Sequence, residues 1–337
     1  MVESVVRNLG IAVALFSLTL APSASAQDLP GKGIVVQPIS DGDNGSSYFR
    51  YLIVQRGLEA LGYTVEEQQE ANYPTVHLAV ANGDSDYTPV HWQPLHNAFF
   101  ENAGGEKVMS RVGTLTPNMK QGYLIDKRAA ETYGISNIGQ LSDPKLAAVF
   151  DSDGDGKANL VGCNPGWGCE RIIENHMTAY KLSDTIHHDQ GEYVALVADM
   201  LERYKKGQSI LYYTWSPFWL SSVLKPGTDV IWLNVPFSAS PDDPNANTEA
   251  ADGTNTGFAL STIRVVANNK FLDENPAARK FFEVATIPLA DSEAEENIIQ
   301  NGESSPEDIE RHASEWIQAN RTTFDGWVSE ALKAAQP

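Results

Sequence analysis

The sequence predicts an α/β fold built as two lobes with a ligand cleft between them. Three observations lead to this prediction. The chain has 337 residues, enough for two domains of ordinary size. Strand-like and helix-like segments alternate along its first part, which favours a mostly parallel sheet. A second set of such segments begins near residue 132, and a strand at 262–267 precedes a helical C-terminal third.

The first set of segments begins after a short lead. A serine at position 46 or 47 can cap a helix that ends near residue 61, where Gly62 supplies a stop signal. Apolar and β-branched residues predict strands on either side of this helix. These strands are expected at 34–39, at 63–68, at 86–92 and around Leu124 and Ile125.

The second set of strands and helices is predicted from the same kinds of pattern. Near its end, at residue 263, the chain is expected to return to the first lobe. Residues 236–257 are rich in Pro, Asn, Asp, Ser and Gly, so we expect a long surface loop there. We assign residues 27–131 and 263–337 to lobe A and residues 132–262 to lobe B. Ligands favour the cleft between two such lobes. The expected elements are helices at 192–206, 276–285, 307–320 and 324–335, and strands at 209–215, 230–235 and 262–267.

The N-terminal residues 1–26 have the pattern of a secretory signal. Arg7 supplies a positive charge, a mostly apolar run covers 9–20, and Ala-Ser-Ala at 24–26 fits a cleavage site. The apolar run is too short to span a bilayer, and after cleavage we expect a soluble protein in an oxidising compartment, with an N-terminal anchor helix as the alternative. The formal net charge of −20 argues against nucleic acid and anionic membranes as partners.

The segment CNPGWGC contains the only two cysteines of the chain, Cys163 and Cys169. In an oxidising compartment we expect them to be paired. Closing the ring would stabilise the folded state by about 2.4 kcal/mol, because it reduces the conformational entropy of the unfolded chain. It also directs the indole of Trp167, which stands between glycines and is poorly placed for core packing. The ring therefore predicts a ligand-facing tryptophan, although an indole that merely covers the disulfide is the alternative.

Two other tryptophans stand where strands are expected to end. Trp92 and Trp215 are each followed two residues later by a proline, Pro94 and Pro217. An indole at the end of a strand faces a cleft more easily than the core, and three such indoles can form an aromatic box. A box of this kind suits a cation that cannot donate hydrogen bonds, such as a quaternary ammonium, with about 0.5–2 kcal/mol from each ring.

Polar groups beside the box predict a partner for a negative charge. His96 lies four residues after Trp92, in the expected first turn of a helix. The backbone N–H groups of Gly168 and Cys169 can reach a carboxylate if a helix begins near Glu170. A cation box next to a carboxylate clamp describes a site for a betaine, which carries both charges.

A second motif, DSDGDGKAN, matches part of a calcium loop. The position that normally supplies a final carboxylate is Gly162, so the match is partial and an Asp/Gly-rich turn is the alternative. We expect no required cofactor and a possible structural calcium ion. The tentative calcium ligands are Asp151, Asp153, Asp155, Lys157 and Asn159.

The sequence signals for an enzymatic activity are weaker than those for ligand binding. Cys169 and His96 could imitate a thiol nucleophile and its base, but a cysteine in a disulfide cannot serve. The sequence contains no glycine-rich phosphate loop and no HExxH motif. We therefore predict that the protein is not an enzyme.

With these residues identified, the chain resembles the periplasmic glycine betaine/proline betaine-binding proteins of osmoprotectant ABC importers. The resemblance extends along nearly the whole chain after the signal, and the CNPGWGC ring is its most specific part. It rests on DLPGKGI, W-x-P-L-H at 92–96, the DxDGDGKA-x-L-x-GCNPGWGCE segment through 170, YYTW at 212–215, VPFSA at 235–239 and FDGWVSEAL at 324–332.

The resemblance implies a type II periplasmic binding-protein fold that closes around its ligand. It places the tryptophan box on Trp92, Trp167 and Trp215, and the carboxylate contacts on His96 and the N–H groups of Gly168 and Cys169. It also implies a periplasmic location after cleavage, a membrane permease as partner and a protein that acts as a monomer. A receptor for choline, carnitine or an amino acid is the alternative in the same class, and a secreted small-amide hydrolase is the alternative in another.

Overall fold

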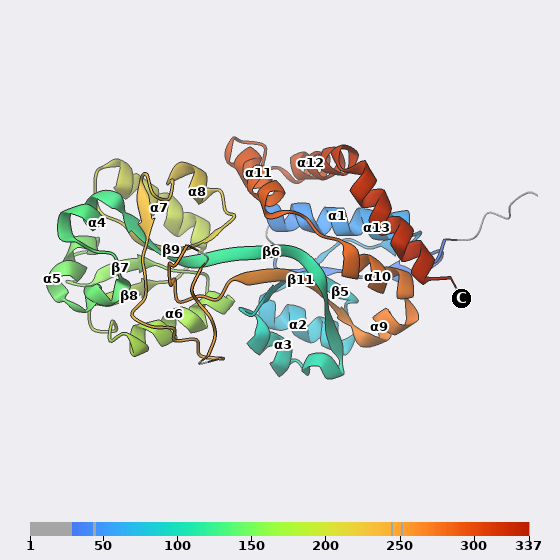
Figure 1. The fold of residues 1–337 in the computed structure, drawn as a ribbon, viewed down its shortest axis with the longest axis horizontal. Helices are drawn as coiled ribbons and strands as arrows, with labels where there is room; N and C mark the ends of the chain where they lie inside the picture. The colour runs from blue at the N-terminus through green and yellow to red at the C-terminus, as the bar shows by residue number, and fades with distance from the viewer. Residues whose placement is uncertain (1–28, 43–44, 244, 251, 337) are drawn as a thin grey trace, which may run out of the picture.

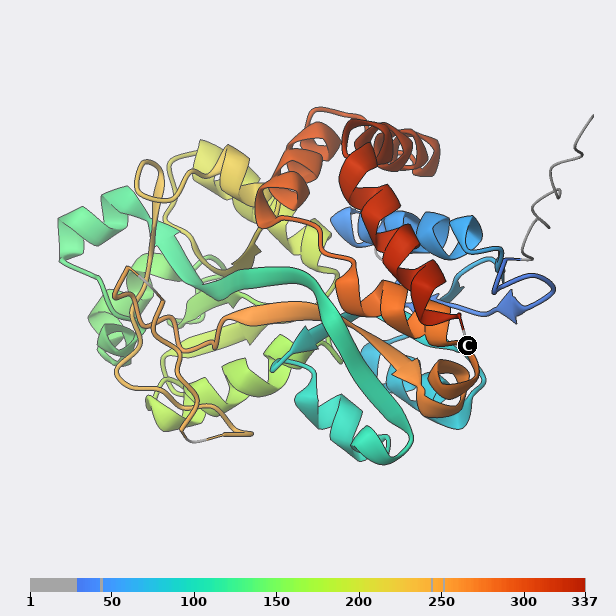
Figure 2. The same cartoon turned by 45° about the vertical axis from the view of Figure 1, so that its right-hand side comes forward.

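The computed structural model describes residues 29–42, 45–243, 245–250 and 252–336, so the predicted signal at 1–26 lies outside the described residues. Figure 1 shows two bodies side by side, joined by two long strands that run next to each other, and Figure 2 shows the same arrangement after rotation. Among the described helices we find none with the length and apolar character needed to cross a membrane.

Lobe A combines short N-terminal strands, a cover of helices and the C-terminal third of the chain. Its helices pack around one large apolar cluster, and a smaller cluster lies beneath α2. The elements are β1 (Val35–Val36), β2 (Ile39–Ser40), α1 (Ser46–Ala60), β3 (Thr64–Val65), β4 (Gln69–Glu70), α2 (Tyr73–Asn82), β5 (Tyr87–Gln93), α3 (Asn97–Asn102), the 3-10 turn η1 (Gly105–Lys107), β11 (Ser261–Asn268), α9 (Asn269–Glu274), α10 (Pro276–Val284), α11 (Leu289–Gln300), α12 (Pro306–Ala319) and α13 (Arg321–Ala334).

Lobe B is built from the middle of the chain around a separate apolar cluster. Strand β6 (Met109–Asp126) leads into it from lobe A. The other elements are α4 (Lys127–Tyr133), η2 (Ile138–Ser142), α5 (Pro144–Ala147), η3 (Ala148–Phe150), β7 (Ala158–Val161), α6 (Gly168–Ala179), β8 (Ile186–Asp189), α7 (Tyr193–Lys205), β9 (Leu211–Ser216), α8 (Leu220–Val223) and β10 (Val230–Trp232).

The main sheet is mixed, and the prediction of a mostly parallel sheet is wrong. Its strand order is β5-β11-β6-β9-β7-β8, with β10 also paired to β6. The pairs β5–β11, β11–β6, β6–β9 and β6–β10 are antiparallel, whereas β7 is parallel to β8 and to β9. The reason is that β6 and β11 carry the chain in opposite directions between the lobes, and parallel pairing is confined to the strands that helices connect.

The local predictions agree with the structure better for helices than for strands. Helix α1 ends one residue before the predicted position, and Gly62 adopts the left-handed φ of 92° that stops it. The serine cap is wrong, because Ser46 and Ser47 lie inside the helix and accept hydrogen bonds from the Arg50 guanidinium. The strand expected around Leu124 belongs to the 18-residue β6.

The strand pairing and the apolar clusters show where the chain passes from lobe A to lobe B. Residues 119 and earlier in β6 pair with β11, while residues from Lys120 onward pair with β9. Tyr123 and Ala130, which the boundary at residue 131 assigns to lobe A, pack in the cluster of lobe B. The lobe boundaries stay a prediction, and the packing favours a crossing inside β6 over one at residue 131. Strands β6 and β11 therefore connect the two lobes, and β6 contributes Met119 and Gln121 to the cavity between them.

Candidate functional site

A cavity of about 590 Å³ lies between the lobes and contains every ligand-binding residue predicted from the sequence. Lobe A contributes Trp92 and His96, and lobe B contributes Trp167, Gly168, Cys169 and Trp215. Leu95 and Trp215 pack against the apolar clusters of both lobes, so the lobes are in contact at this point. The structure therefore brings the predicted residues together, while their role in binding a ligand stays a prediction.

The three tryptophans, which we call the tryptophan box, stand roughly perpendicular around one space. The ring centroids of Trp92 and Trp215 are 6.5 Å apart with an interplanar angle of 84°. Those of Trp167 and Trp215 are 5.6 Å apart at 72°. Rings that are tilted in this way present several π faces to a single central group instead of stacking on one another. The geometry is compatible with a compact cation in the middle.

Each indole is positioned by a different local device. Trp92 lies one residue before the end of β5, and Trp215 lies one residue before the end of β9, as the following prolines indicate. Trp167 is the residue that precedes α6. Three separate segments thus meet at the cavity, and strand ends and a helix start point their side chains into it.

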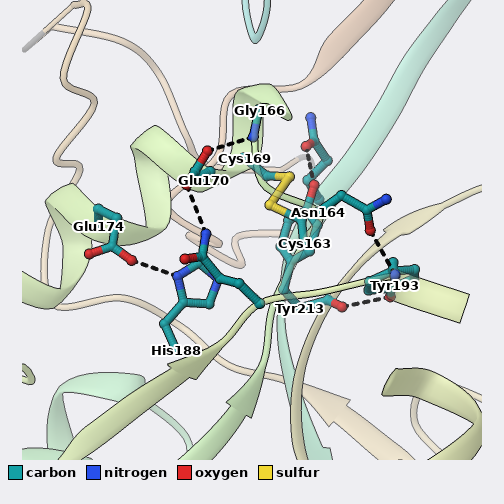
Figure 3. Close-up of a disulfide and its surroundings, with 11 residues drawn as sticks. Cys163, Asn164, Gly166, Cys169, Glu170, Glu174, His188, Tyr193 and Tyr213 are labelled. Atoms are coloured by element: carbon teal, nitrogen blue, oxygen red, sulfur yellow. Dashed lines mark hydrogen bonds and ion pairs between the residues drawn. A yellow bond between two sulfur atoms is a disulfide. The ribbon is translucent and has the colours of Figure 1, made fainter. Parts of the chain in front are cut away.

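The disulfide ring is fastened to its surroundings, as Figure 3 shows. Cys163 and Cys169 form the expected disulfide, and both are buried. The N–H of Gly166 donates to Glu170 Oε2 at 2.7 Å, and the N–H of Tyr193 donates to Asn164 Oδ1 at 2.7 Å. These bonds tie the ring to α6 and α7, so the Trp167 indole is held from both sides.

His96 is almost fully buried and lies directly before α3, one residue earlier than the predicted first turn. The N–H of Trp92 lies 3.3 Å from its Nδ1, and a ring N–H of His96 is also within reach of the Val90 carbonyl oxygen. Burial lowers the pKa of His96 well below its usual value, and the nearby His77 lowers it further. A neutral His96 can therefore donate one hydrogen bond without bringing a positive charge next to a ligand cation.

The first turn of α6 supplies backbone donors at the cavity. The helix begins at Gly168, two residues earlier than predicted, and no side chain caps it. As the first two helical residues, Gly168 and Cys169 have no acceptor for their N–H groups inside the helix. The helix dipole makes this end favourable for an anion. The arrangement suits a carboxylate on the side of the cavity opposite a cation.

Gly168 also marks a close approach of the two lobes. A Cβ built at this position would lie 2.7 Å from Leu95 Cγ, 2.9 Å from the Leu95 carbonyl oxygen and 3.0 Å from His96 Cδ2. Leu95 and His96 belong to lobe A, whereas Gly168 begins α6 in lobe B. Only a residue without a side chain allows this approach.

The cavity has aromatic walls that the sequence analysis missed. The Tyr193 ring lies 5.1 Å from Trp215 and 5.9 Å from Trp167, and the Phe218 ring lies 4.3 Å from Trp215. Tyr193 begins a helix with an ordinary amphipathic pattern, so no local signal distinguishes it. Phe218 follows Pro217 in YYTWSPFW, and that aromatic density was the available hint.

The predicted calcium loop runs from the end of η3 into β7, and the disulfide ring follows that strand. The Asp151 carboxylate accepts N–H groups from Gly154 and Gly156, and these bonds lower its pKa. Asn159 Oδ1 already accepts from the N–H and hydroxyl of Ser152. Carboxylate oxygens of Asp153 and Asp155 and a ring nitrogen of His187 lie within 4.8 Å of one another.

The position of the missing final carboxylate has a steric explanation. A Cβ at Gly162 would lie 1.8 Å from His188 Nε2, so an acidic side chain cannot enter there without moving that ring. The Lys157 ammonium donates to the Ser183 carbonyl oxygen, which fastens the loop to the turn before β8. Calcium binding at residues 151–159 stays a prediction.

Comparisons with known proteins show the family of this chain. Residues 39–319 match the family described as the substrate binding domain of ABC-type glycine betaine transport system. The chain is 48% identical over 319 residues to the glycine betaine/proline betaine-binding periplasmic protein of Escherichia coli (strain K12), covering 95% of this chain and 96% of that protein. It is 46% identical to the protein of the same name from Salmonella typhimurium, covering 97% of this chain and 99% of that protein.

Solved structures share the fold at low sequence identity. An ABC-transporter choline binding protein in complex with choline has a TM-score of 0.68 at 19% identity, covering 89% of this chain and 96% of that one. Lactococcal OpuAC in its closed-liganded conformation with glycine betaine has a TM-score of 0.65 at 20% identity, covering 88% and 99%. These likenesses confirm the predicted two-lobed fold. The chain belongs to the family of substrate-binding domains of ABC-type glycine betaine transport systems.

Proposed function

We propose that this protein captures glycine betaine, or a related quaternary ammonium zwitterion, and delivers it to the permease of an ABC importer. One observation carries the proposal: indoles from three separate segments meet in one cavity with His96 and the start of α6. The relatives described above bear the names of periplasmic glycine betaine-binding proteins. We further propose a periplasmic location, cleavage near residue 26, a monomeric state and no catalytic step.

The two halves of the site match the two halves of a betaine. A trimethylammonium group has no N–H to donate, so it gains from the π faces of Trp92, Trp167 and Trp215 in a space with little water. The carboxylate accepts from His96 Nε2–H and from the N–H groups of Gly168 and Cys169. Because the site offers donors to one end and only π faces to the other, it orients the ligand.

Closure of the lobes completes the proposed mechanism. Trp92 and His96 come from lobe A, and the other contacts come from lobe B. In an open protein the two halves of the site are therefore apart, and a ligand can contact only one of them. A bound ligand stabilises the closed form by the contacts that exist only there. The closed form is then the species that docks on the permease, and opening there releases the ligand.

The proposal is tested by calorimetry with glycine betaine, proline betaine, choline, carnitine and proline. For the wild-type protein we expect the betaines to bind more tightly than choline, because choline has no carboxylate. In His96→Ala we expect glycine betaine to lose about 10- to 100-fold in affinity, the usual range for a hydrogen bond to a charged group, while choline changes little. Tyr133→Ala, which removes an exposed ring of lobe B outside the cavity, is the control. Choline binding that exceeds betaine binding, or that falls equally in His96→Ala, would favour a choline receptor.

A structural calcium ion at residues 151–159 is a separate proposal. Calcium at ten times its dissociation constant would add about 1.4 kcal/mol of stability, which raises the melting temperature by a few degrees. We expect this rise in the wild-type protein when calcium replaces EDTA, and no rise in Asp151→Asn. Asp184→Asn, an exposed acidic residue outside the loop, is the control. Equal melting temperatures of the wild type in calcium and in EDTA would exclude the ion.

A further inference from the structure

A hydrogen bond connects the two lobes at one end of the cavity. Glu296, on α11 of lobe A, accepts through Oε2 from the backbone N–H of Trp219 at 3.0 Å. Glu296 is 5% exposed, and both residues line the cavity. Figure 1 shows α11 at the top of the molecule, on the side that faces α8 of the other lobe. The bond therefore closes a wall of the cavity to which both lobes contribute.

The partners of this bond are anchored in different lobes. On α11, Leu289 and Ile299 pack against the apolar cluster of lobe A. Phe218 and Trp219 pack against the apolar cluster of lobe B. Since each partner moves with its own lobe, separation of the lobes must break this bond, and the Trp219 N–H then donates to water.

The lobe A side of the bond is held in place by polar contacts to the next helix. Glu295, directly before Glu296, contacts His312 Nδ1 of α12 through Oε1 at 3.0 Å. The indole N–H of Trp316 on α12 donates to Asp291 at 2.8 Å. These two contacts fix the turn of α11 that presents Glu296 to the cleft.

The lobe B side of the bond is continuous with the tryptophan box. Trp215, Phe218 and Trp219 lie on one short segment, and the Phe218 ring lies between the other two, 4.3 Å from Trp215 and 5.1 Å from Trp219. A ligand cation that packs on Trp215 therefore orders the segment that also carries the N–H donor. Trp215, the proposed ligand contact, and Trp219, which donates across the cleft, are only four residues apart.

We infer that Glu296 is a latch of the closed form: it slows ligand release by accepting the Trp219 N–H across the cleft, and it acts as a positioning residue without touching the ligand. The inference rests on the proposed function for its ligand. Its physical basis is that a closed protein without this acceptor would leave a backbone N–H buried without a partner. Removal of the acceptor does not destabilise the open protein, because there the Trp219 N–H donates to water.

The first test compares Glu296→Ala with Glu296→Gln by calorimetry and stopped-flow tryptophan fluorescence with glycine betaine. We expect Glu296→Ala to release the ligand roughly tenfold faster, with little change in the association rate. Glu296→Gln keeps an amide oxygen as acceptor and should stay within about threefold of the wild type. Glu293→Ala, at an exposed position of the same helix, is the control. Equal losses in the alanine and glutamine variants would overturn the latch and would indicate that the carboxylate charge attracts the ligand cation directly.

The second test removes the donor instead of the acceptor. Trp219 has a φ of −52°, which proline tolerates, so Trp219→Pro deletes the N–H. Because the proline ring would clash with the Glu296 carboxylate, Trp219→Pro and Trp219→Ala are compared in the Glu296→Ala background. There we expect slower release from the proline variant, because only the alanine variant leaves a buried N–H without a partner. Equal release rates in the two variants would contradict the inference.

Amide hydrogen exchange separates a failed latch from a failed ligand assignment. Without any ligand, we expect the Trp219 amide to exchange faster in Glu296→Ala than in the wild type or in Glu296→Gln. Absence of glycine betaine binding by the wild type would reject the proposed function, whereas this exchange difference would still stand. Equal exchange of Trp219 in all three proteins would reject the latch, whichever ligand binds.

Discussion

Replacing Trp167 with alanine is expected to weaken glycine betaine binding by roughly 30- to 1000-fold, or about 2–4 kcal/mol. The indole lies 5.6 Å from the Trp215 ring and comes from a covalent ring tied to two helices, so no other side chain can easily take its place. The effect exceeds that of a flexible surface aromatic because the position of Trp167 is fixed before the ligand arrives. Pre-organisation of this kind reduces the ordering cost of binding.

Calorimetry measures this loss, and the thermal melt separates it from unfolding. Trp167 is only partly buried, so the free energy of unfolding without ligand should change by less than about 1 kcal/mol. Trp167→Phe should recover part of the affinity, because a phenyl ring offers a weaker π face. Trp232→Phe, on a strand outside the cavity, is the control. Tight binding by Trp167→Ala would contradict the tryptophan box.

Replacing Gly168 with valine is expected to reduce betaine affinity by at least about 100-fold, because it prevents the lobes from closing. A Cβ at this position already approaches Leu95 and His96 to 2.7–3.0 Å, and the valine methyl groups would extend further into lobe A. The contact is between lobes, so each lobe can still fold. The variant should therefore separate closure from stability.

Small-angle scattering and calorimetry check this result together. With saturating glycine betaine the wild type should contract, whereas Gly168→Val should keep the dimensions of the ligand-free protein. Gly168→Ala should show a smaller loss, since only a single carbon is added. Gly326→Val is the control, because a Cβ there meets no atom within 4 Å. Contraction and normal affinity in Gly168→Val would show that the lobes do not close through this contact.

The candidate site was largely predictable because its residues stand in short segments with local signals. Trp167, Gly168 and Cys169 fall in one seven-residue ring, and prolines mark the strand ends that follow Trp92 and Trp215. Tyr193, Phe218 and Glu296 were not found, since each reaches the cavity through packing between elements far apart in sequence. Glu296 is one of many acids on helices, and nothing in its neighbours distinguishes it.

The fold was predictable to the extent that it depends on local patterns. Helices α10, α12 and α13 begin and end within three residues of the expected positions, because apolar periodicity and end signals are properties of the segment itself. The direction of the strands was predicted wrongly. The residue pattern of an apolar strand is the same whether its neighbour is parallel or antiparallel. The mixed sheet could therefore not be predicted from the sequence.

Residue types and their spacing were enough to predict a disulfide ring that holds an indole, two further tryptophans at strand ends, and donors suited to a carboxylate. How these parts meet depends on the tertiary structure. It brings Trp92 of lobe A to Trp215 of lobe B, places Gly168 against Leu95 and His96, and joins Glu296 to the Trp219 N–H. The physical reason is that residue type fixes what a group can bind, whereas contacts across a cleft depend on the path of β6 and β11 between two separately packed cores.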